Sequence, residues 1–480
     1  MKNCFIKILV LLSVLGSLPA VASGEVVLNV RDYGAVGDGV AMDTLALQET
    51  IDACAEKGGG TVWVPAGDYQ IGSIKLKSHV TLSLDYGATL LGSQDIADYV
   101  NDMGKKREGS GHCLIYAVDA TDIRIEGLGE IDGRGTPEAF PRKQGSPRPH
   151  LLNIINCERV TLSGVTYRRP ASWGLHFVDS KDIHIDGVTV RFRNNGYNND
   201  GLDLDGCENV LIENCDIDAG DDGICLKSSK NPCRNFVIRN CKVASNTAPL
   251  KLGTSSRGGF IDIKVTNCYF YDSPMGAIKL QLVDGGRLEN VDISRIVMED
   301  VGNPIFIRLG NRGRSYENFK GQKYNADVEP EGVPVGTLRN VRIRDVNAVV
   351  TVETRENAYR ATHMKKDLMK RSDEEWEKMA KTKSGPIMIS GIPGHLVEDV
   401  LLENIRISFP GGGTEEDAAQ VVPEDIARYP EQFFFGVLPA WGAYVRHAKD
   451  VTFRNVALEL REPDARERIV LEDVVGFTEE

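Results

Sequence analysis

The sequence lacks an excess of positive charge and, beyond its first residues, any long apolar run. Its 480 residues include 56 Lys and Arg against 69 Asp and Glu, which gives a formal net charge of −13. This balance argues against a nucleic-acid partner, because phosphate binding needs a basic face. No later segment reaches the 18 apolar residues of a membrane-spanning helix, so we expect no membrane span.

Closely spaced cysteine pairs are also lacking. None of the ten cysteines forms a CxxC pair, so a zinc site is not expected, and we predict neither a metal nor another cofactor. Nine cysteines follow residue 50, and an odd number leaves at least one thiol free. Most should be small buried apolar residues, with Cys225 and Cys233 the best candidates for a disulfide.

The N-terminal residues have the pattern of a secretory signal peptide. Lys2 and Lys7 are followed by an apolar run over residues 8–18 and by a small-x-small sequence at residues 20–22. The run is too short to span a bilayer. We therefore predict that residues 1–22 are a signal peptide and that residues 23–480 form an exported chain, either periplasmic or extracellular.

A short pattern of alternating polar and apolar residues recurs along the chain. Its copies are Asp122–Ile125, Arg159–Leu162, Asp182–Ile185, Asn209–Ile212, Asn235–Ile238, Asp262–Val265, Asn290–Ile293, Asn340–Ile343, Asp399–Leu402 and Asp450–Phe453. Alternation with period two predicts strands. From 160 to 291 the copies recur about every 26 residues, and the last three intervals are interpreted as two periods each with insertions.

A period near 26 fits one coil of a parallel β-helix with about three strands. Stacked coils share one continuous core, so the whole of residues 23–480 can be a single domain. We predict an all-β, right-handed parallel β-helix with loop insertions. An open end needs a cap, and residues 43–57 supply a capping helix in which Asp43 is the N-cap candidate and Leu47 lies on the apolar face. A second helical insertion is predicted at about 360–383.

Two acidic clusters, residues 198–205 and 219–224, are the main candidates for chemistry. Asp200 and Asp221 are 21 residues apart, about one short coil, so these two carboxylates and Asp222 should converge outside the helix. Crowded carboxylates raise at least one pKa, so one group stays protonated while another is ionised. One acid and one base are what hydrolysis of a glycosidic bond requires.

Other interpretations of these clusters remain open. Asp and Asn also occur at β-helix corners for their turn geometry, and a carboxylate cluster can bind calcium. Asp203 and Asp205 alternate with leucines, so they should point outward, either into solvent or into the same groove.

At these residues the sequence resembles glycoside hydrolase family 28, the polygalacturonase and rhamnogalacturonan hydrolase family. Residues 198–201, Asn-Asn-Asp-Gly, match the family's Asn-Thr-Asp-Gly motif, and residues 220–222, Gly-Asp-Asp, match its second motif. The resemblance implies an inverting hydrolase in which Asp221 is the general acid, while Asp200 and Asp222 activate the attacking water. Such an enzyme leaves room for that water, so acid and base are expected about 6.5–9.5 Å apart.

Two further family motifs are only partly present. No His occurs near residues 248–251, where the family has Gly-His-Gly, and Ala277-Ile278-Lys279 keeps the Lys but not the Arg of its Arg-Ile-Lys motif. In the family these residues contact the substrate at the cleavage site. Lys279 therefore remains a candidate for binding a sugar carboxylate, and Lys251 could substitute in part for the missing groups.

Other side chains could complete the substrate site. Arg308 and Arg312 belong to a segment with three Arg in seven residues, which could bind an acidic sugar in a bidentate manner or form a solvated loop. Trp173 could stack on a sugar ring or pack within the coils. The predicted substrate-binding residues are Tyr197, Asn198, Lys227, Lys251, Lys279, Arg308 and Arg312.

The leading hypothesis is a monomeric, exported glycoside hydrolase that acts on an acidic plant cell-wall glycan, with galacturonate-containing pectin as the best candidate. Insertions after Arg314 and Tyr359 could block one end of the groove and favour exo-action. One alternative is a β-helical polysaccharide lyase or epimerase, which needs a cationic base and often calcium. Another is a non-catalytic carbohydrate-binding β-helix.

Overall fold

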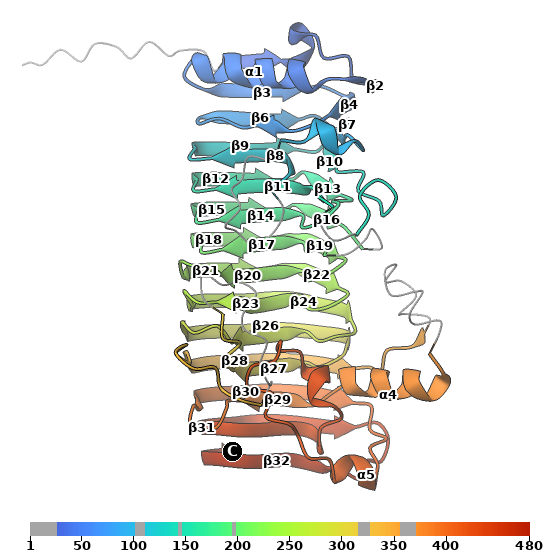
Figure 1. Cartoon of the computed structure of the whole chain (residues 1–480), viewed down its shortest axis with the longest axis vertical. Coiled ribbons are helices and arrows are strands. Elements are labelled where there is room, and N and C mark those ends of the chain that lie inside the picture. The colour runs from blue at the N-terminus through green and yellow to red at the C-terminus, as the bar shows by residue number, and fades with distance from the viewer. Residues whose placement is uncertain (1–25, 101–110, 143–145, 194–197, 315–326, 356–370) are drawn as a thin grey trace, which may run out of the picture.

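The chain forms a long stack of parallel strands. The computed structural model describes residues 26–100, 111–142, 146–193, 198–314, 327–355 and 371–480. Helix α1 (Thr44–Glu56) covers one end of the stack and strand β32 lies at the other (Figure 1). Every pairing between named strands is parallel, and consecutive coils pair with one another. The predicted all-β parallel β-helix is confirmed.

The longest of three strand columns, the long sheet, runs the full length of the stack. It contains β1 (Val27–Asn29), β3 (Gly60–Val64), β6 (Val80–Leu84), β9 (Thr121–Gly127), β12 (Glu158–Ser163), β15 (Lys181–Asp186), β18 (Glu208–Glu213), β21 (Cys233–Arg239), β24 (Phe260–Ser273), β26 (Arg287–Val301), β28 (Thr337–Val350), β30 (Val397–Phe409), β31 (Ala440–Leu460) and β32 (Glu467–Glu479). The strands from β24 onward are long enough to continue into the next column, since β24 pairs with both β21 and β22.

The second column, the short sheet, is continuous with the later part of the long sheet. It contains β2 (Asp38–Met42), β4 (Gly67–Ile71), β7 (Ala88–Gly92), β10 (Glu130–Asp132), β13 (Thr166–Arg168), β16 (Thr189–Arg191), β19 (Asp216–Ala219) and β22 (Lys242–Ser245). Its inward side chains pack in the central core together with those of the other two columns.

The third column, here called the site sheet, carries the candidate chemistry. It contains β5 (Ile74–Lys75), β8 (Cys113–Val118), β11 (His150–Ile155), β14 (Leu175–Val178), β17 (Leu202–Asp205), β20 (Ile224–Ser228), β23 (Leu250–Ser256), β25 (Ile278–Leu282), β27 (Ile305–Leu309) and β29 (Ile387–Ser390), and it ends on the first part of β31. Its strands are almost wholly buried on both faces, which already shows that something covers the outer side.

The copies of the sequence repeat form successive strands of the long sheet and are paired there in register. The first apolar residues of all ten copies are partners on successive strands: Ile123, Val160, Ile183, Val210, Phe236, Ile263, Val291, Val341, Val400 and Val451. Each is buried, so these positions form one apolar column of the core. Burial of one face fixes the register, because a slip of one residue would expose the whole set.

The interpretation of the last three intervals as two coils each is wrong. Val291 pairs directly with Val341, Val341 with Val400, and Val400 with Val451. Each interval is therefore one coil lengthened by a long connection. Loops lie outside the stack and add length without adding a coil, so spacing alone overestimates the number of coils.

The polar residue at the start of each repeat has a left-handed backbone conformation. In all ten copies its φ lies between 54° and 60°. Asn and Asp tolerate this region better than most residues, which explains their repeated use. Their side chains also form ladders: Asn235 Nδ2 donates to Asn209 Oδ1 at 2.8 Å, and Asn209 Nδ2 donates to Asp182 Oδ1 at 2.9 Å.

Helix α1 caps the stack as expected, but its N-terminus is built differently. Leu47 and Ile51 are fully buried against the first coil. Asp43 makes no side-chain cap hydrogen bond to the helix. Its carboxylate instead accepts from the backbone N–H groups of Val36 at 2.7 Å and Gly37 at 3.0 Å, so it holds the preceding loop against the helix.

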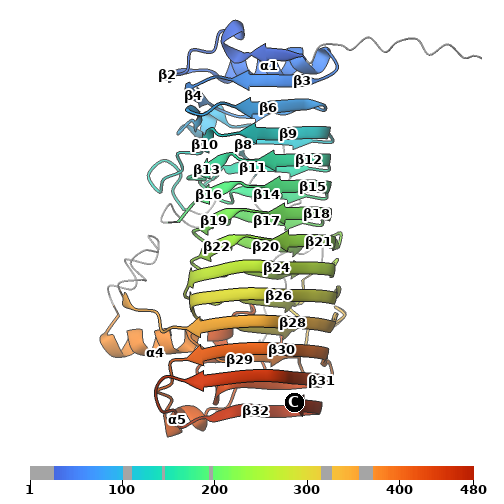
Figure 2. The same ribbon diagram turned by 180° about the vertical axis from the view of Figure 1, so that it is seen from behind.

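Three connections late in the chain are the longest. Helix α4 (Asp373–Lys383) belongs to the connection between β28 and β29 and projects from the side of the stack in both views (Figures 1 and 2). It lies within the predicted interval 360–383, of which residues 360–370 fall outside the described part of the chain. The connection between β30 and β31 contains α5 (Glu415–Ala418) and the 3-10 helix η3 (Gln432–Phe435).

The cysteines of the described residues form no disulfide. All nine cysteines of the described residues are buried and free, so the predicted Cys225–Cys233 disulfide is wrong. The signal peptide predicted at residues 1–22 lies outside the described residues. No helix within the described ranges is long and apolar enough to cross a membrane.

Candidate active site

The three aspartates singled out in the sequence come together beside the site sheet. Asp200 lies two residues before β17, and Asp221 and Asp222 lie in the turn between β19 and β20. The Gly201 N–H donates to the Asp222 carbonyl at 2.8 Å, which sets Asp200 level with Asp222 rather than with Asp221. The coil is thus 22 residues long here, one more than the spacing of Asp200 and Asp221 suggested.

The aspartate cluster is more compact than expected. One carboxylate oxygen from each of Asp200, Asp221 and Asp222 lies within 4.8 Å of those of the other two. The spacing of about 6.5–9.5 Å predicted for acid and base is not what the structure has, because Asp221 and Asp222 are adjacent and Asp200 is stacked on them. The oxygens are close enough to share a cation, although ammonium groups already lie beside them.

Asp222 is the aspartate held in its ionised form. Its Oδ2 accepts from Lys251 Nζ at 2.8 Å, and its Oδ1 accepts from the Thr247 hydroxyl at 2.6 Å. Burial alone would raise the pKa of Asp222, but the charges of Lys251, Lys227 and Lys279 outweigh it and hold that pKa below the usual value. Lys251 on β23 is the register partner of Cys225 on β20, three residues after Asp222, and its side chain reaches back to the Asp222 carboxylate.

The pKa of Asp221 is shifted in the opposite direction. Burial, reinforced by the negative charge of Asp222, raises the pKa of Asp221 to about 6. Asn198 Nδ2 lies 3.4 Å from its Oδ2, and Thr247 Oγ1 lies 3.2 Å from its Oδ1. Burial and the neighbouring charges of Asp203 and Asp221 also raise the pKa of Asp200 well above its ordinary value. The cluster therefore offers one base beside two groups that favour the protonated form.

Lys227 supports the cluster from the side of β20. Its Nζ lies 3.2 Å from Asp203 Oδ1 and 3.9 Å from Asp200 Oδ2, and it sits 4.6 Å from the centre of the Trp173 ring. Asp203 is fully buried, and Asp205 accepts from the Ser229 N–H at 2.7 Å. Neither carboxylate is solvated, so of the two predictions for this pair only the groove-side placement of Asp203 fits.

A group of aromatic and basic side chains extends the site toward β11 and β14. Trp173 makes ring contacts with His150 and His176 at 5.3 and 5.0 Å. Burial lowers the pKa of His150 to about 4, so this ring is neutral near neutral pH. Arg148 donates to Asn198 Oδ1 at 2.9 Å and is only partly buried, which brings a positive charge to the rim of the aspartate cluster.

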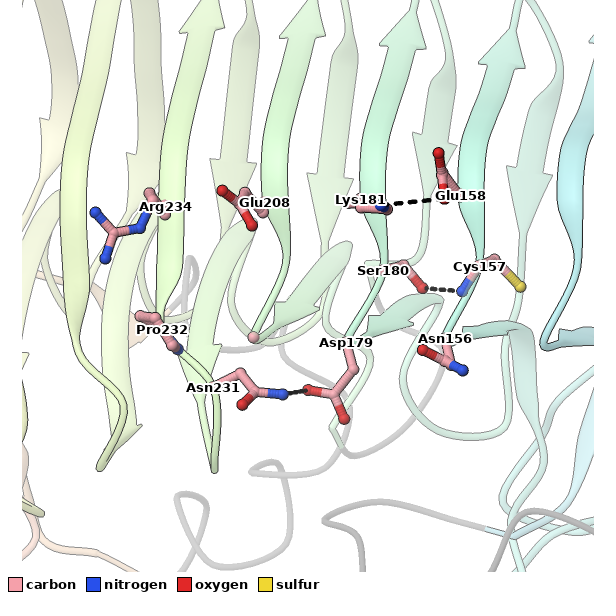
Figure 3. Close-up of a pocket in the computed structure, with 11 residues that line it drawn as sticks. Asn156, Cys157, Glu158, Asp179, Ser180, Lys181, Glu208, Asn231, Pro232 and Arg234 are labelled. Carbon is pink, nitrogen blue, oxygen red and sulfur yellow. Dashed lines mark hydrogen bonds and ion pairs between the residues drawn. The ribbon is translucent and has the colours of Figure 1, made fainter.

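A separate pocket of about 550 Å³ lies at the other end of β17. Glu158, Lys181, Glu208 and Arg234 are register partners on successive strands there, and Asn231 Nδ2 donates to Asp179 Oδ1 at 2.8 Å (Figure 3). None of the side chains that line this pocket is aromatic. Alternating charges on neighbouring strands account for its polar lining as a surface ladder of the stack.

Residues 54–366 match the sequence profile of Glycosyl hydrolases family 28. This range contains the aspartate cluster and covers more than half of the chain. The chain belongs to glycosyl hydrolase family 28. It is therefore a glycoside hydrolase. The two aspartate motifs lie next to each other beside the site sheet of its β-helix.

Individual relatives of this family 28 chain agree with the assignment. A protein of Vitis vinifera named probable polygalacturonase is 30% identical over 342 aligned positions, and the match covers 66% of this chain and 67% of the relative. An exo-poly-alpha-D-galacturonosidase of Dickeya chrysanthemi is 26% identical over 388 residues and is matched over 62% of its own length, less than two thirds. The Yersinia enterocolitica family 28 exopolygalacturonase shares the fold with a TM-score of 0.69 at 21% identity, covering 94% of this chain and 78% of that one.

The remaining predicted cations of the family 28 chain are bound to the protein itself. Lys279 is 1% exposed and forms an ion pair with Glu431. Arg308 donates to four oxygens, those of Ser390, Gly391, Glu424 and Asp425, and burial lowers its pKa to about 10. Arg312 pairs with Asp284 and donates to the Thr254 carbonyl at 3.1 Å.

These contacts show where the structure places the predicted binding residues. The solvated-loop alternative for Arg308 and Arg312 is wrong, since both are buried, and their bonds to protein oxygens leave the prediction that they hold an acidic sugar without support. Asn198, Lys227 and Lys251 do lie at the aspartate cluster. Tyr197 falls outside the described residues.

Sequence reasoning missed four residues of the site. Thr247 directly precedes residues 248–251, where the family's histidine would fall, and its position was the available signal. Arg148 lies 50 residues before Asn198, and Tyr429 and Glu431 lie about 150 or more residues from the lysines they contact. No local pattern marks these three, because only the coiling of the chain brings them to the site.

Proposed function

We propose that the chain is an inverting hydrolase that acts from one end of a galacturonate-containing pectic polysaccharide or oligosaccharide. The observation that carries the proposal is the pair of adjacent carboxylates whose pKa values are shifted in opposite directions by their contacts. Asp221, with a pKa raised to about 6, is suited to protonate the leaving oxygen. Asp222, kept ionised by Lys251, is suited to take a proton from water.

The roles of the three aspartates follow from their contacts. Water bound between Asp222 and Asp200 would meet one charged and one protonated carboxyl, so that Asp200 orients the water and Asp222 accepts its proton. The Thr247 hydroxyl donates to Asp222 at 2.6 Å and lies 3.2 Å from Asp221, so it contacts both carboxylates and helps to fix their positions. Inversion requires that this water attack from the face opposite the leaving oxygen. Since oxygens of the three carboxylates lie within 4.8 Å of one another, closer than the usual spacing of an inverting enzyme, the inverting outcome is proposed from the family resemblance and not from the spacing.

Two observations support the substrate class and the exo mode. Relatives that share up to 30% of their residues are named for polygalacturonate cleavage, one of them as an exo-acting enzyme. On this chain the partly exposed Arg148 supplies a positive charge near the cluster on the side of β11. On the opposite side the connection before β31 covers the strands that follow β20, so only one side of the cluster is open to a long glycan within the described residues.

The lyase alternative has less support. A lyase needs a base that can lose its proton, and Lys251 is the nearest amine to the cluster. Burial opposes the charge on Lys251, but Asp222, Tyr429 and Glu431 outweigh it and raise its pKa well above the ordinary value. Lys251 therefore stays protonated. We infer export of the chain from the pattern of residues 1–22, with the enzyme meeting its glycan outside the cytoplasm.

A screen of pectic oligosaccharides with the wild type and Asp221→Asn tests the proposed function. We expect release of sugar from one end by the wild type and a loss of kcat by about 10²- to 10⁴-fold in the variant, because the acid is removed. Asp182→Asn is the matched control: Asp182 lies at an exposed corner where the next two coils have Asn, so activity should not change.

The same screen separates the alternatives. A new double bond in the product, seen as ultraviolet absorption, would indicate a lyase, and sugar binding without turnover would indicate a binding protein. Proton NMR of the first product gives the stereochemistry. An anomer of retained configuration would overturn the inverting mechanism, and failure to cleave any galacturonate-containing glycan would overturn the substrate assignment.

A further inference from the structure

The connection before β31 forms a strap over the outer face of the site sheet. The strap, residues 421–435, crosses the strands that follow the aspartate cluster. The Pro430 carbonyl accepts from Gln281 on β25 at 2.6 Å, the Ile426 carbonyl accepts from the Asn311 N–H at 2.8 Å, and the Glu424 carbonyl accepts from Arg308 on β27 at 2.8 Å. Gln281 belongs to one coil and Arg308 and Asn311 to the next, while Arg446 on β31 donates to the Val422 carbonyl at 2.9 Å, so the strap spans several coils of the stack.

Apolar packing fixes the far part of the strap. Val422 and Phe435 are buried against Phe306, Met388 and Tyr444, which are register partners on β27, β29 and β31. The near part reaches the aspartate cluster: the Tyr429 hydroxyl lies 3.4 Å from Lys251 Nζ, and Lys251 contacts Asp222. Tyr429 is 43% exposed, so it forms the rim where the strap ends and the open groove begins.

Glu431 of the strap lies between two lysines of the site sheet. Lys251 on β23 and Lys279 on β25 are register partners, so their side chains project side by side from the outer face. Glu431 forms an ion pair with Lys279 through Oε2, and its Oε1 lies 3.7 Å from Lys251 Nζ. All three side chains are buried.

The charges around Glu431 balance without a substrate. Two ammonium groups, Lys251 and Lys279, face two carboxylates, Asp222 and Glu431. A third carboxylate brought here by a uronic acid would find both of these ammonium groups already paired, and within the described part of the chain it would meet two like charges in a buried site. Burying an uncompensated charge is strongly unfavourable. The hydroxyl groups of a neutral sugar carry no such cost.

We infer that Glu431 selects a sugar without a carboxylate for the subsite on the strap side of the aspartate cluster. Glu431 stands where the acid group of a uronate would pair with Lys279, and so it acts as a built-in substitute for that group. The inference rests on the proposed function and sharpens it. Because the strap closes this side, the subsite holds the terminal sugar, which is a neutral hexose or deoxyhexose, while galacturonate lies on the open side.

The first experiment compares two oligosaccharides that share a galacturonate chain and differ only in the terminal residue, galactose or galacturonate. We expect the wild type to have the higher kcat/KM for the galactose-terminated compound. In Glu431→Gln, Lys279 loses its partner and the ratio of kcat/KM values should move toward the galacturonate-terminated compound by about tenfold or more, since like-charge contact is removed. Glu431→Asp keeps the charge and should keep the neutral preference.

Glu416→Gln is the matched control. Glu416 lies exposed in α5, in the same connection, and the same chemical change there should leave the ratio within about twofold. An equal shift in Glu416→Gln, or no shift in Glu431→Gln with an unchanged melting temperature, would overturn the role of Glu431. A wild-type preference for the galacturonate-terminated compound would overturn it as well.

A binding experiment separates this inference from the proposed function. Calorimetry with Asp221→Asn and with Asp221→Asn/Glu431→Gln measures affinity for methyl galactoside and methyl galacturonoside. The inference predicts that the single variant binds the neutral glycoside more tightly and that the double variant binds the acidic one more tightly. If the wild type cleaves nothing and this pattern holds, the proposed function fails while the role of Glu431 stands. Tighter binding of the acidic glycoside by the single variant would overturn that role.

Discussion

At the scale of single residues, Asp221 and Asp222 show how neighbours in the chain acquire different chemistry. Asp222 is buried and Asp221 is partly buried, and burial by itself would raise the pKa of each. Only Asp222 contacts an ammonium group directly, at 2.8 Å from Lys251 Nζ, and this charge-assisted hydrogen bond reverses the effect of burial. Lys251 thus supplies a cation beside the position where the family's histidine is missing.

These protonation states predict the pH profile of the enzyme. Asp221 must carry a proton to act as an acid, and its pKa of about 6 means that activity falls as the pH rises through about 6. Asp222 must be ionised, and its lowered pKa means that activity falls on the acid side only below the ordinary range of an aspartate. A profile of kcat/KM against pH measures both limbs. A limb at neutral or alkaline pH would contradict the role of Asp221.

Replacement of Lys251 tests the cause of this difference. In Lys251→Met the buried Asp222 loses its cation, so its pKa rises and the acid limb of the profile moves upward by about 1–3 pH units. Lys264→Met removes an equivalent charge from an exposed position on β24 and should leave the limb in place. The melting temperature of each variant shows whether the fold is kept. An acid limb that stays fixed in a folded Lys251→Met would contradict the assignment.

At the scale of elements, the connections between strands, and not the strands themselves, determine which part of the site sheet is covered. The insertions after Arg314 and Tyr359, which could block one end of the groove, lie partly outside the described residues. The element that covers the site sheet in the described part of the chain is the strap at residues 421–435. Most of the strap is irregular, with only η3 at its C-terminal end, and its contacts are distributed over several coils.

Helix α1 is the element on which the first coil depends. Leu47 is fully buried between the helix and the coil, so Leu47→Ala leaves a cavity and should lower the free energy of unfolding by about 2–5 kcal/mol. Leu45 lies on the same helix but is 69% exposed, and Leu45→Ala should change stability by no more than about 0.5 kcal/mol. Urea unfolding of both variants measures the difference. Equal losses would show that the helix does not pack on the coil as described.

At the scale of the whole molecule, the two ends of the stack differ. The first coil is covered by α1, whereas β32 pairs only with β31 among the described strands and most of its residues are partly or fully exposed. In a stacked repeat each coil is stabilised mainly by its neighbours, so a coil with one neighbour opens more readily.

Hydrogen exchange should reveal this asymmetry. We expect backbone amides of residues 467–479 to exchange faster than those of residues 202–213, because the latter strands pair on both sides. Mass spectrometry of peptides from the two regions gives the comparison within one sample. Equal protection would mean that another surface covers β32 in solution.

Much of the fold follows from the sequence alone. The alternation of polar and apolar residues identified ten strands of the long sheet with their mutual register, because one buried face leaves a single alignment. The corner Asn and Asp residues identified the left-handed turns. The number of coils in the last part was overestimated, since an inserted loop changes sequence spacing without changing the stack.

The sequence alone predicted only those parts of the candidate site that belong to local motifs. Asp200, Asp221 and Asp222 come from neighbouring coils, and a repeat of known period is enough to bring them together. Their ionisation, the role of Thr247 and the pairing of Lys279 with Glu431 were decided by the tertiary structure. Lys279 and Glu431 are 152 residues apart, and charge in a buried site depends on every group that surrounds it, including groups that no local pattern connects.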